Sequence, residues 1–98
     1  MKVEYKNKKL KKVCTIASVT EKAYSRQMAD KIQQRIAELE SAETVEELMQ
    51  FHIGRCHPLH QNRENQYAMD LVHPMRLVFE KKGDEIQIAE IVEIVDYH

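Results

Sequence analysis

The chain has 98 residues, which is enough for one domain with a single hydrophobic core and too few for two. Its 15 lysines and arginines nearly balance its 16 aspartates and glutamates, so the composition excludes disorder driven by net charge. The net charge therefore gives no argument for a polyanionic partner, although basic residues are concentrated in residues 1–35 and a local basic patch is compatible with the sequence.

Residues 1–5 predict a short opening strand that places Val3 and Tyr5 on one face. Asn7 is a suitable N-cap for the lysine-rich helix that follows, because its side chain can accept a hydrogen bond from a free backbone N–H. The exposed side of this helix carries four lysines, which indicate a solvated face or a nucleic-acid contact: Lys8, Lys9, Lys11 and Lys12.

A second, longer helix is predicted over residues 21–39, with Thr20 as its N-cap and a short link to the first helix around Val19 and Thr20. Its apolar side chains recur at helical spacing and predict a stripe that faces the core: Tyr24, Met28, Ile32, Ile36 and Leu39. Thr44 begins one more helical turn, in which Glu47 is placed for a capping box.

Residues 51–66 have little periodicity and predict a long ordered loop, a kind of segment that is often functional in small domains. The loop contains four residues of types that bind zinc: His52, Cys56, His57 and His60. Gly54 and Pro58 interrupt any helix that would align these side chains, and no second ligand pair of zinc-finger spacing follows. We therefore predict no metal site.

The remainder of the chain predicts three strands joined by hairpins. Residues 67–72 and 75–80 alternate in polarity, and His73-Pro74 between them marks a turn because proline cannot donate to a ladder. Lys82-Gly83-Asp84 predicts the next hairpin turn.

The isoleucine-rich run from residue 86 to residue 98 predicts a central strand. Strict alternation fails in this run, so either both faces are partly buried or a bulge lies near Ala89 and Glu90. The complete order of elements predicts an α+β fold, with helices covering one sheet face and the other face partly open.

The two cysteines, Cys14 and Cys56, lie far apart, and no apolar signal-peptide core follows the lysine-rich start. No apolar run approaches the length that spans a membrane. We therefore predict a cytoplasmic protein that makes no membrane contact and keeps both thiols reduced and free.

The loop and the end of the last strand carry residue types that suit phosphodiester cleavage without a metal. Such a reaction needs a base for the ribose 2′-hydroxyl, an acid for the leaving oxygen and cations for the phosphate. His57 and His98 can exchange protons near neutral pH, and Tyr97 can position or stack on a base. Three arginines offer bidentate contacts to phosphate: Arg55, Arg63 and Arg76. The same residues are also compatible with an ordinary polar surface.

Three motifs resemble those of the HigB toxins, the plasmid maintenance system killer proteins of the RelE superfamily. Asp96-Tyr97-His98 resembles the D-Y-H ending of that family, and Cys56-His57-Pro58-Leu59 followed by Arg63 resembles its H-P-L-K-G-D-R segment. Residues 72–79, VHPMRLVF, resemble its central hairpin, where an arginine begins a strand of the type R-L-x-F. With the opening VEYK and the order of the helices, the resemblance covers essentially the whole chain.

The resemblance implies a single RelE/HigB-like toxin domain over residues 1–98, in which two N-terminal helices pack on a small, mostly antiparallel sheet. It implies a toxin of a type II toxin–antitoxin system, an endoribonuclease that cleaves mRNA in the ribosomal A site without a cofactor. The implied partners are the ribosome with its mRNA and a HigA-type helix-turn-helix antitoxin.

Residue by residue, the resemblance implies four catalytic positions: His57, Asp96, Tyr97 and His98. It also implies that Arg76 holds phosphate, and we expect Arg55 and Arg63 to help through their guanidinium groups. The sequence departs from the family where His60 replaces the usual lysine, so His60 is either a substitute RNA contact or a bystander. An alternative is a binding or regulatory module of the same fold whose catalytic function has decayed.

Overall fold

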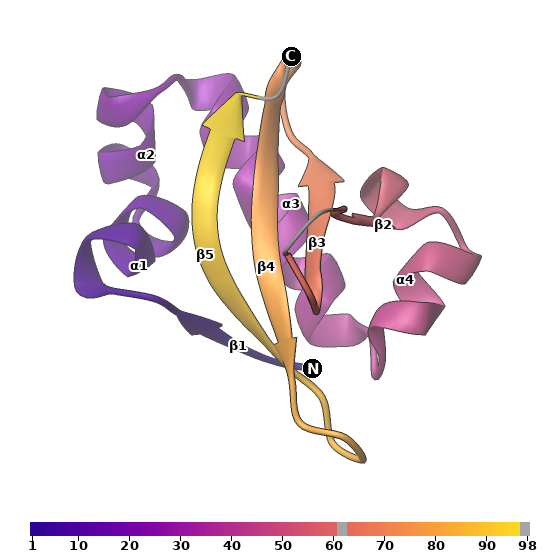
Figure 1. The fold of residues 1–98 in the computed structure, drawn as a ribbon. Helices are drawn as coiled ribbons and strands as arrows, with labels where there is room; N and C mark the ends of the chain where they lie inside the picture. Colours follow the sequence, from indigo (N-terminus) through magenta and orange to yellow (C-terminus); the bar gives the residue numbers. More distant parts are fainter. Residues whose placement is uncertain (61–62, 97–98) are drawn as a thin grey trace.

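A computed structural model describes residues 1–60 and 63–96 of the chain (Figure 1). The elements, in chain order, are β1 (Lys2–Tyr5), α1 (Lys8–Thr15), α2 (Ala17–Ala23), α3 (Arg26–Ser41), α4 (Val45–Gln50), the 3₁₀ turn η1 (Ile53–Arg55), β2 (His57–Pro58), β3 (Gln66–Asp70), β4 (Met75–Lys82) and β5 (Ile88–Asp96). The strands form one sheet in the order β1-β5-β4-β3-β2. The β1–β5 pair is parallel and the other three neighbouring pairs are antiparallel, so the predicted α+β class with a mostly antiparallel sheet is confirmed.

Two of the predicted helix caps are confirmed. The Asn7 side chain accepts a hydrogen bond from the backbone N–H of Leu10 at 2.8 Å, and the Thr44 hydroxyl accepts one from the N–H of Glu47 at 3.2 Å. The Glu47 carboxylate accepts a bond from the N–H of Glu43 at 3.1 Å, one residue before the cap. The Asn7 and Thr44 side chains thus satisfy N–H groups that a helix start leaves without a partner.

The predicted start of the long helix is wrong. Thr20 lies inside α2, and its hydroxyl donates to the carbonyl groups of Val13 and Ile16, so it ties α2 to the end of α1. Ser25 is the actual cap of α3 and accepts a hydrogen bond from the N–H of Met28 at 3.0 Å. Three helices therefore precede α4 in place of the predicted two. Thr20 and Ser25 both have hydroxyl groups suited to capping, and the tertiary contact of Thr20 with α1 decides between them.

The core lies between α3 and the sheet. The stripe predicted for α3 is buried from Met28 to Leu39, whereas Tyr24 falls in the link before α3 and is partly exposed. The helix stripe packs with buried side chains of three strands: Met69, Leu77, Phe79 and Ile91. Figure 1 shows α3 behind the sheet, with α1 and α2 beside β5 and α4 on the side of β2 and β3.

The final strand is central, as predicted, but it begins at Ile88 and contains a bulge two residues beyond the predicted place. Ile91 is paired with Phe79 and Glu93 with Val78, so Val92 is the extra residue. The bulge shifts the alternation by one residue. As a result Ile91 and Ile94 both pack with the core, while Glu93 points to the opposite side.

The predicted loop contains two short elements that the sequence did not indicate. The turn η1 and the two-residue strand β2 lie within it, and β2 adds the fifth strand by pairing with β3. A strand of two residues is too short to show any periodicity, which is why it was missed. The predicted turns after β3 and β4 are confirmed, with a cis peptide at His73-Pro74 and a positive φ of 81° at Gly83.

The sheet face opposite the helices is called the open face here. Residues paired across antiparallel strands share a face. In a regular strand, the residues directly before and after a core-facing residue point to the opposite face, and these residues define the open face. On β3, β4 and β5 its members are Gln66, Ala68, Asp70, Arg76, Val78, Glu80, Lys82, Ile88, Glu90, Glu93 and Val95. Ala68 and Val78 are fully buried even though they lie on this face, so other residues cover them.

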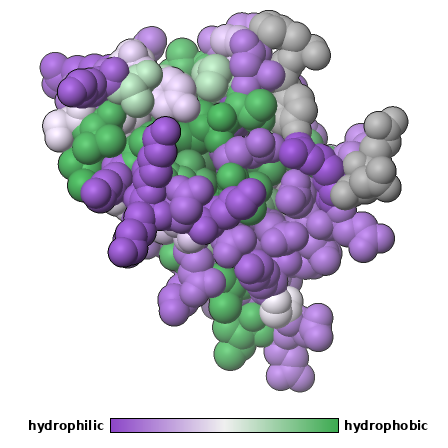
Figure 2. Space-filling view, turned by 60° about the vertical axis from the view of Figure 1, so that its left-hand side comes forward, coloured by the Kyte–Doolittle hydropathy of each residue, from purple (hydrophilic) through white to green (hydrophobic). Residues whose placement is uncertain are grey.

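Figure 2 shows the side of the molecule that carries α1 and α2, where apolar and polar side chains are interspersed. Apolar atoms are also visible at the tip of the β4–β5 hairpin, the lowest part of both views. In the segment between these strands, Ile86 is 84% exposed. Among the helices of residues 1–60 and 63–96, none combines the length and apolar character needed to cross a membrane.

Two isoleucines of the same segment give a matched test of the core. Ile91→Ala should lower the free energy of unfolding by about 2–5 kcal/mol, because Ile91 is fully buried and its truncation leaves a cavity. Ile86→Ala removes the same atoms from an exposed site and should cost less than about 0.5 kcal/mol. Urea unfolding followed by circular dichroism measures both, and equal costs would contradict this assignment of the core.

Both cysteines should be unreactive in the folded protein. Cys14 and Cys56 are buried, and burial raises the pKa of each thiol to about 12, so the reactive thiolate is scarce at neutral pH. We expect alkylation by iodoacetamide to be more than about tenfold slower than in denaturant, where both thiols should react. Native labelling of either cysteine at the denatured rate would contradict this packing.

Candidate active site

Arg55, His57, Asp70 and Arg76 meet at the end of the open face where β3 ends and β4 begins. Asp70 and Arg76 are directly paired across the β3–β4 hairpin, and β2 places His57 opposite Ala68 on the neighbouring strand. Figure 1 shows β3 ending in the upper half of the sheet beside β2, with β4 beginning above it. Three residues that the sequence suggested for phosphodiester chemistry, Arg55, His57 and Arg76, are therefore neighbours.

Two contacts determine the protonation pattern of the His57 ring. Its Nδ1 lies 2.8 Å from the backbone carbonyl oxygen of Arg55, and its Nε2 lies 3.3 Å from Nη1 of Arg76. A carbonyl oxygen only accepts and a guanidinium only donates, so Nδ1 carries the proton and Nε2 accepts. His57 thus directs an unprotonated Nε2 towards the guanidinium that would hold a phosphate.

Asp70 connects the two arginines. Its Oδ2 is 3.2 Å from Nε of Arg55, and its Oδ1 is 3.5 Å from Nε of Arg76. The carboxylate is mostly buried, and Oδ1 accepts no hydrogen bond within the described part of the chain. Asp70 therefore orients both guanidinium groups, and it leaves their terminal nitrogens to contact other groups.

The sequence reasoning did not assign Asp70 to the site, although a signal was present. Asp70 and Arg76 stand equally far from His73, at the centre of the predicted turn, so the hairpin register alone pairs them. A carboxylate and a guanidinium directly opposite each other on one face of a hairpin form a favourable cross-strand pair.

Arg35 of α3 also holds the cluster in place, although the sequence did not suggest a role for it. This buried arginine donates from Nε to the backbone carbonyl of Asp70 at 2.6 Å and from Nη1 to Glu38 at 2.7 Å. A side chain at Gly54 would place its Cβ 2.8 Å from Nε of Arg35, so only glycine lets η1 approach α3 this closely. Arg35 and Gly54 thereby hold η1 against the end of β3.

The backbone of the turn before β2 is strained. His52, Gly54 and Arg55 all have positive φ angles, of 53°, 59° and 52°. Such angles cost energy in residues with a side chain, and they concentrate at functional sites, where surrounding contacts hold them. Here they turn the Arg55 carbonyl towards the His57 ring.

A pocket of about 280 Å³ lies beside the cluster. It is lined by both arginines, by Asp70 and by the β3–β4 turn: Arg55, Asp70, Leu71, His73, Pro74, Met75 and Arg76. Two cations and one carboxylate give the pocket a positive balance, which suits a phosphate group.

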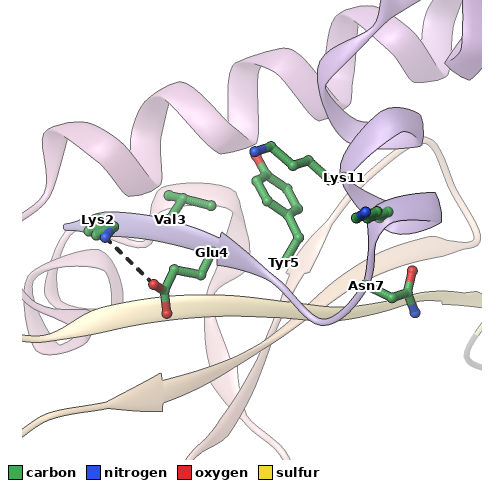
Figure 3. A pocket seen from close by; sticks show the side chains of 7 residues that line it. Lys2, Val3, Glu4, Tyr5, Asn7 and Lys11 are labelled. Atoms are coloured by element: carbon green, nitrogen blue, oxygen red, sulfur yellow. Dashed lines mark ion pairs between the residues drawn. The ribbon is translucent and has the colours of Figure 1, made fainter.

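A larger pocket of about 400 Å³ lies at the opposite edge of the sheet, between β1 and α1 (Figure 3). Lys2 and Glu4 form an ion pair of 3.6 Å there, and Tyr5 lies beside Lys11 in the view. Burial raises the pKa of Tyr5 to about 12, so its phenol stays protonated at neutral pH. This pocket is lined by lysines but contains no histidine to act as a base, and we place the chemistry at the His57 cluster.

The remaining predicted residues are placed differently. Asp96 ends β5 and is paired with Met75, so β5 reaches the start of β4 beside Arg76. Arg63 forms an ion pair of 2.7 Å with Glu93, and His60 is exposed after β2. Tyr97 and His98 lie outside the described residues. Nowhere in residues 1–60 and 63–96 do three histidine, cysteine or acidic side chains converge as metal ligands.

Comparisons with known proteins agree with the fold. No protein-family model matches the chain, and no curated protein sequence matches it. Solved structures that match include a YoeB/ParE toxin from Agrobacterium tumefaciens, which is 14% identical, with a TM-score of 0.63 and complete coverage of both chains. The chain therefore has the α+β fold of a YoeB/ParE toxin, and the HigB assignment stays a prediction.

The tautomer of His57 is directly measurable. In ¹⁵N NMR spectra of the neutral imidazole, Nδ1 should appear as the protonated nitrogen and Nε2 as the acceptor, because the Arg55 carbonyl can only accept a hydrogen bond. Arg76→Leu should keep this tautomer and change the Nε2 shift. A neutral His57 protonated on Nε2 would contradict the geometry of the cluster.

Proposed function

We propose that this protein is a toxin of a type II toxin–antitoxin system, a HigB-like endoribonuclease that cleaves mRNA held by the ribosome. The observation that carries the proposal is His57, whose unprotonated Nε2 faces the Arg76 guanidinium on the open face of a YoeB/ParE-like fold. A base and a phosphate-binding cation side by side are what attack of a 2′-hydroxyl on its neighbouring phosphate requires.

In the proposed reaction, the phosphate of the scissile bond contacts Arg76 and Arg55, and Arg76 moves from His57 to a phosphate oxygen. His57 then takes the proton of the ribose 2′-hydroxyl through Nε2 as the 2′-oxygen attacks phosphorus. The bond to the 5′-oxygen breaks, and an acid returns a proton to that oxygen, leaving a 2′,3′-cyclic phosphate and a 5′-hydroxyl. The arginines stabilise the negative charge that grows on phosphate.

His98 is the proposed acid, and Tyr97 the residue that positions or stacks on a base. Asp96 contributes by orienting an imidazole. The placement of Asp96 at the end of β5, beside the strand that carries Arg76, supports this arrangement. The proposed partners are the ribosomal A site with its mRNA, which places the protein in the cytoplasm, and a HigA-type helix-turn-helix antitoxin.

Two observations favour the alternative of a binding module whose catalysis has decayed. Arg63, expected to contact RNA, is paired with Glu93, and the family's lysine is His60. Induction without an antitoxin separates the two functions, because a ribonuclease arrests growth and a decayed module does not.

Cleavage of mRNA in a purified translation reaction tests the proposal. Wild-type protein should cut the message, and His57→Ala and His98→Ala should each slow cleavage by about 10²–10⁴-fold, the usual contribution of one general acid or base. His52→Asn is the matched control, since His52 is an exposed histidine of the same loop and asparagine tolerates its positive φ. Intact mRNA with wild-type protein, or equal cleavage by all four proteins, would refute the proposal.

A further inference from the structure

Three arginines on or beside the open face are paired with carboxylates of that face. Asp70 contacts Arg55 and Arg76, and Glu93 contacts Arg63. The Arg63–Glu93 pair is separate from the His57 cluster and joins Nη2 to Oε1 at 2.7 Å. A carboxylate that occupies a guanidinium in this way competes with any phosphate for the same donors.

The Arg63–Glu93 pair lies over the centre of the open face. Arg63 precedes β3, and its carbonyl accepts a hydrogen bond from the N–H of Gln66 at 3.1 Å, whereas Glu93 belongs to β5. Since β4 separates these strands, the ion pair crosses β4 near Val78, the partner of Glu93. The complete burial of Val78 agrees with this crossing.

Glu93 also lies in line with the proposed base. The cross-strand row runs from His57 through Ala68 and Val78 to Glu93. At a strand spacing of about 4.8 Å, the two ends of the row are about 14 Å apart. A single RNA strand that crosses the sheet along this row would pass from His57 to the Arg63–Glu93 pair.

We propose that Glu93 determines the specificity of this site by competing with the RNA backbone for Arg63. Free RNA must displace the Glu93 carboxylate from Arg63 and is repelled by its negative charge, so free RNA binds weakly. RNA that the ribosome already positions does not depend on a contact with Arg63. The pair is about one-third exposed at both side chains, a setting in which ion pairs are weak enough for a phosphate to replace. This inference rests on the proposed function.

The bulge at Val92 explains how the carboxylate reaches the open face. Without the extra residue, position 93 would share the face of Ile91 and point towards the helices. The bulge in β5 therefore places the Glu93 carboxylate beside Arg63, and it also lets Ile94 pack against the core.

The test compares Glu93→Gln with Glu90→Gln. Glu90 lies on the same strand and face, also has an ion pair, at 3.0 Å to Lys82, and loses the same charge on substitution. The probe is a short fluorescent oligoribonucleotide with 2′-O-methyl groups, which cannot be cleaved. Glu93→Gln should bind it about three- to tenfold more tightly than Glu90→Gln, with a dependence of log K on log salt steeper by about 0.7.

Arg63→Gln completes a double-mutant cycle. It should abolish the gain in the Glu93→Gln background and have little effect on the wild type, since Arg63 is occupied there. Equal affinities for Glu93→Gln and Glu90→Gln, or an equal effect of Arg63→Gln in both backgrounds, would overturn the inference even if the wild type cleaves mRNA on ribosomes. Failure of the wild type to cleave would refute the proposed function independently of these affinities.

Discussion

The extra residue in β5 is the constraint on which the rest of the structure depends. This strand is paired with β1 on one side and β4 on the other, so its alternation decides which side chains meet the helices. A regular strand could bury Ile91 or Ile94 against the core, but not both, because they are three residues apart. The bulge at Val92 lets both isoleucines pack against the core. It also places Glu93 on the open face.

The His57 cluster depends on a second constraint, the balance of charge around Asp70. Two guanidinium groups close together repel each other, and a single carboxylate between them offsets that repulsion and sets their directions. The same carboxylate limits the positive potential available to a ligand. Arg35 and Gly54 fix the backbone on either side of the cluster, so its geometry is built into the packing of α3 against η1.

Short motifs and residue types suggested three of the residues that the structure places together: Arg55, His57 and Arg76. The sequence suggested both His57 and Arg76 for one site, and the structure brings their side chains into contact, while their chemical roles stay a prediction. Asp70 was missed because a single aspartate in an alternating strand does not indicate a functional site until its cross-strand partner, Arg76, is known. The pairing of Arg63 was missed for a related reason: Glu93 is thirty residues away, and only the bulge turns it towards the open face.

By itself, the sequence determined the type and order of the long elements, the caps at Asn7 and Thr44, the hairpin turns and the central place of the last strand. These features depend on local periodicity and on hydrogen bonds between near neighbours, which a short stretch of residues already contains. Only the tertiary structure decided the division at Ser25, the strand β2, the position of the bulge and the partners of each arginine. Those outcomes depend on packing and charge between segments that meet only when the chain folds, so no local pattern could fix them.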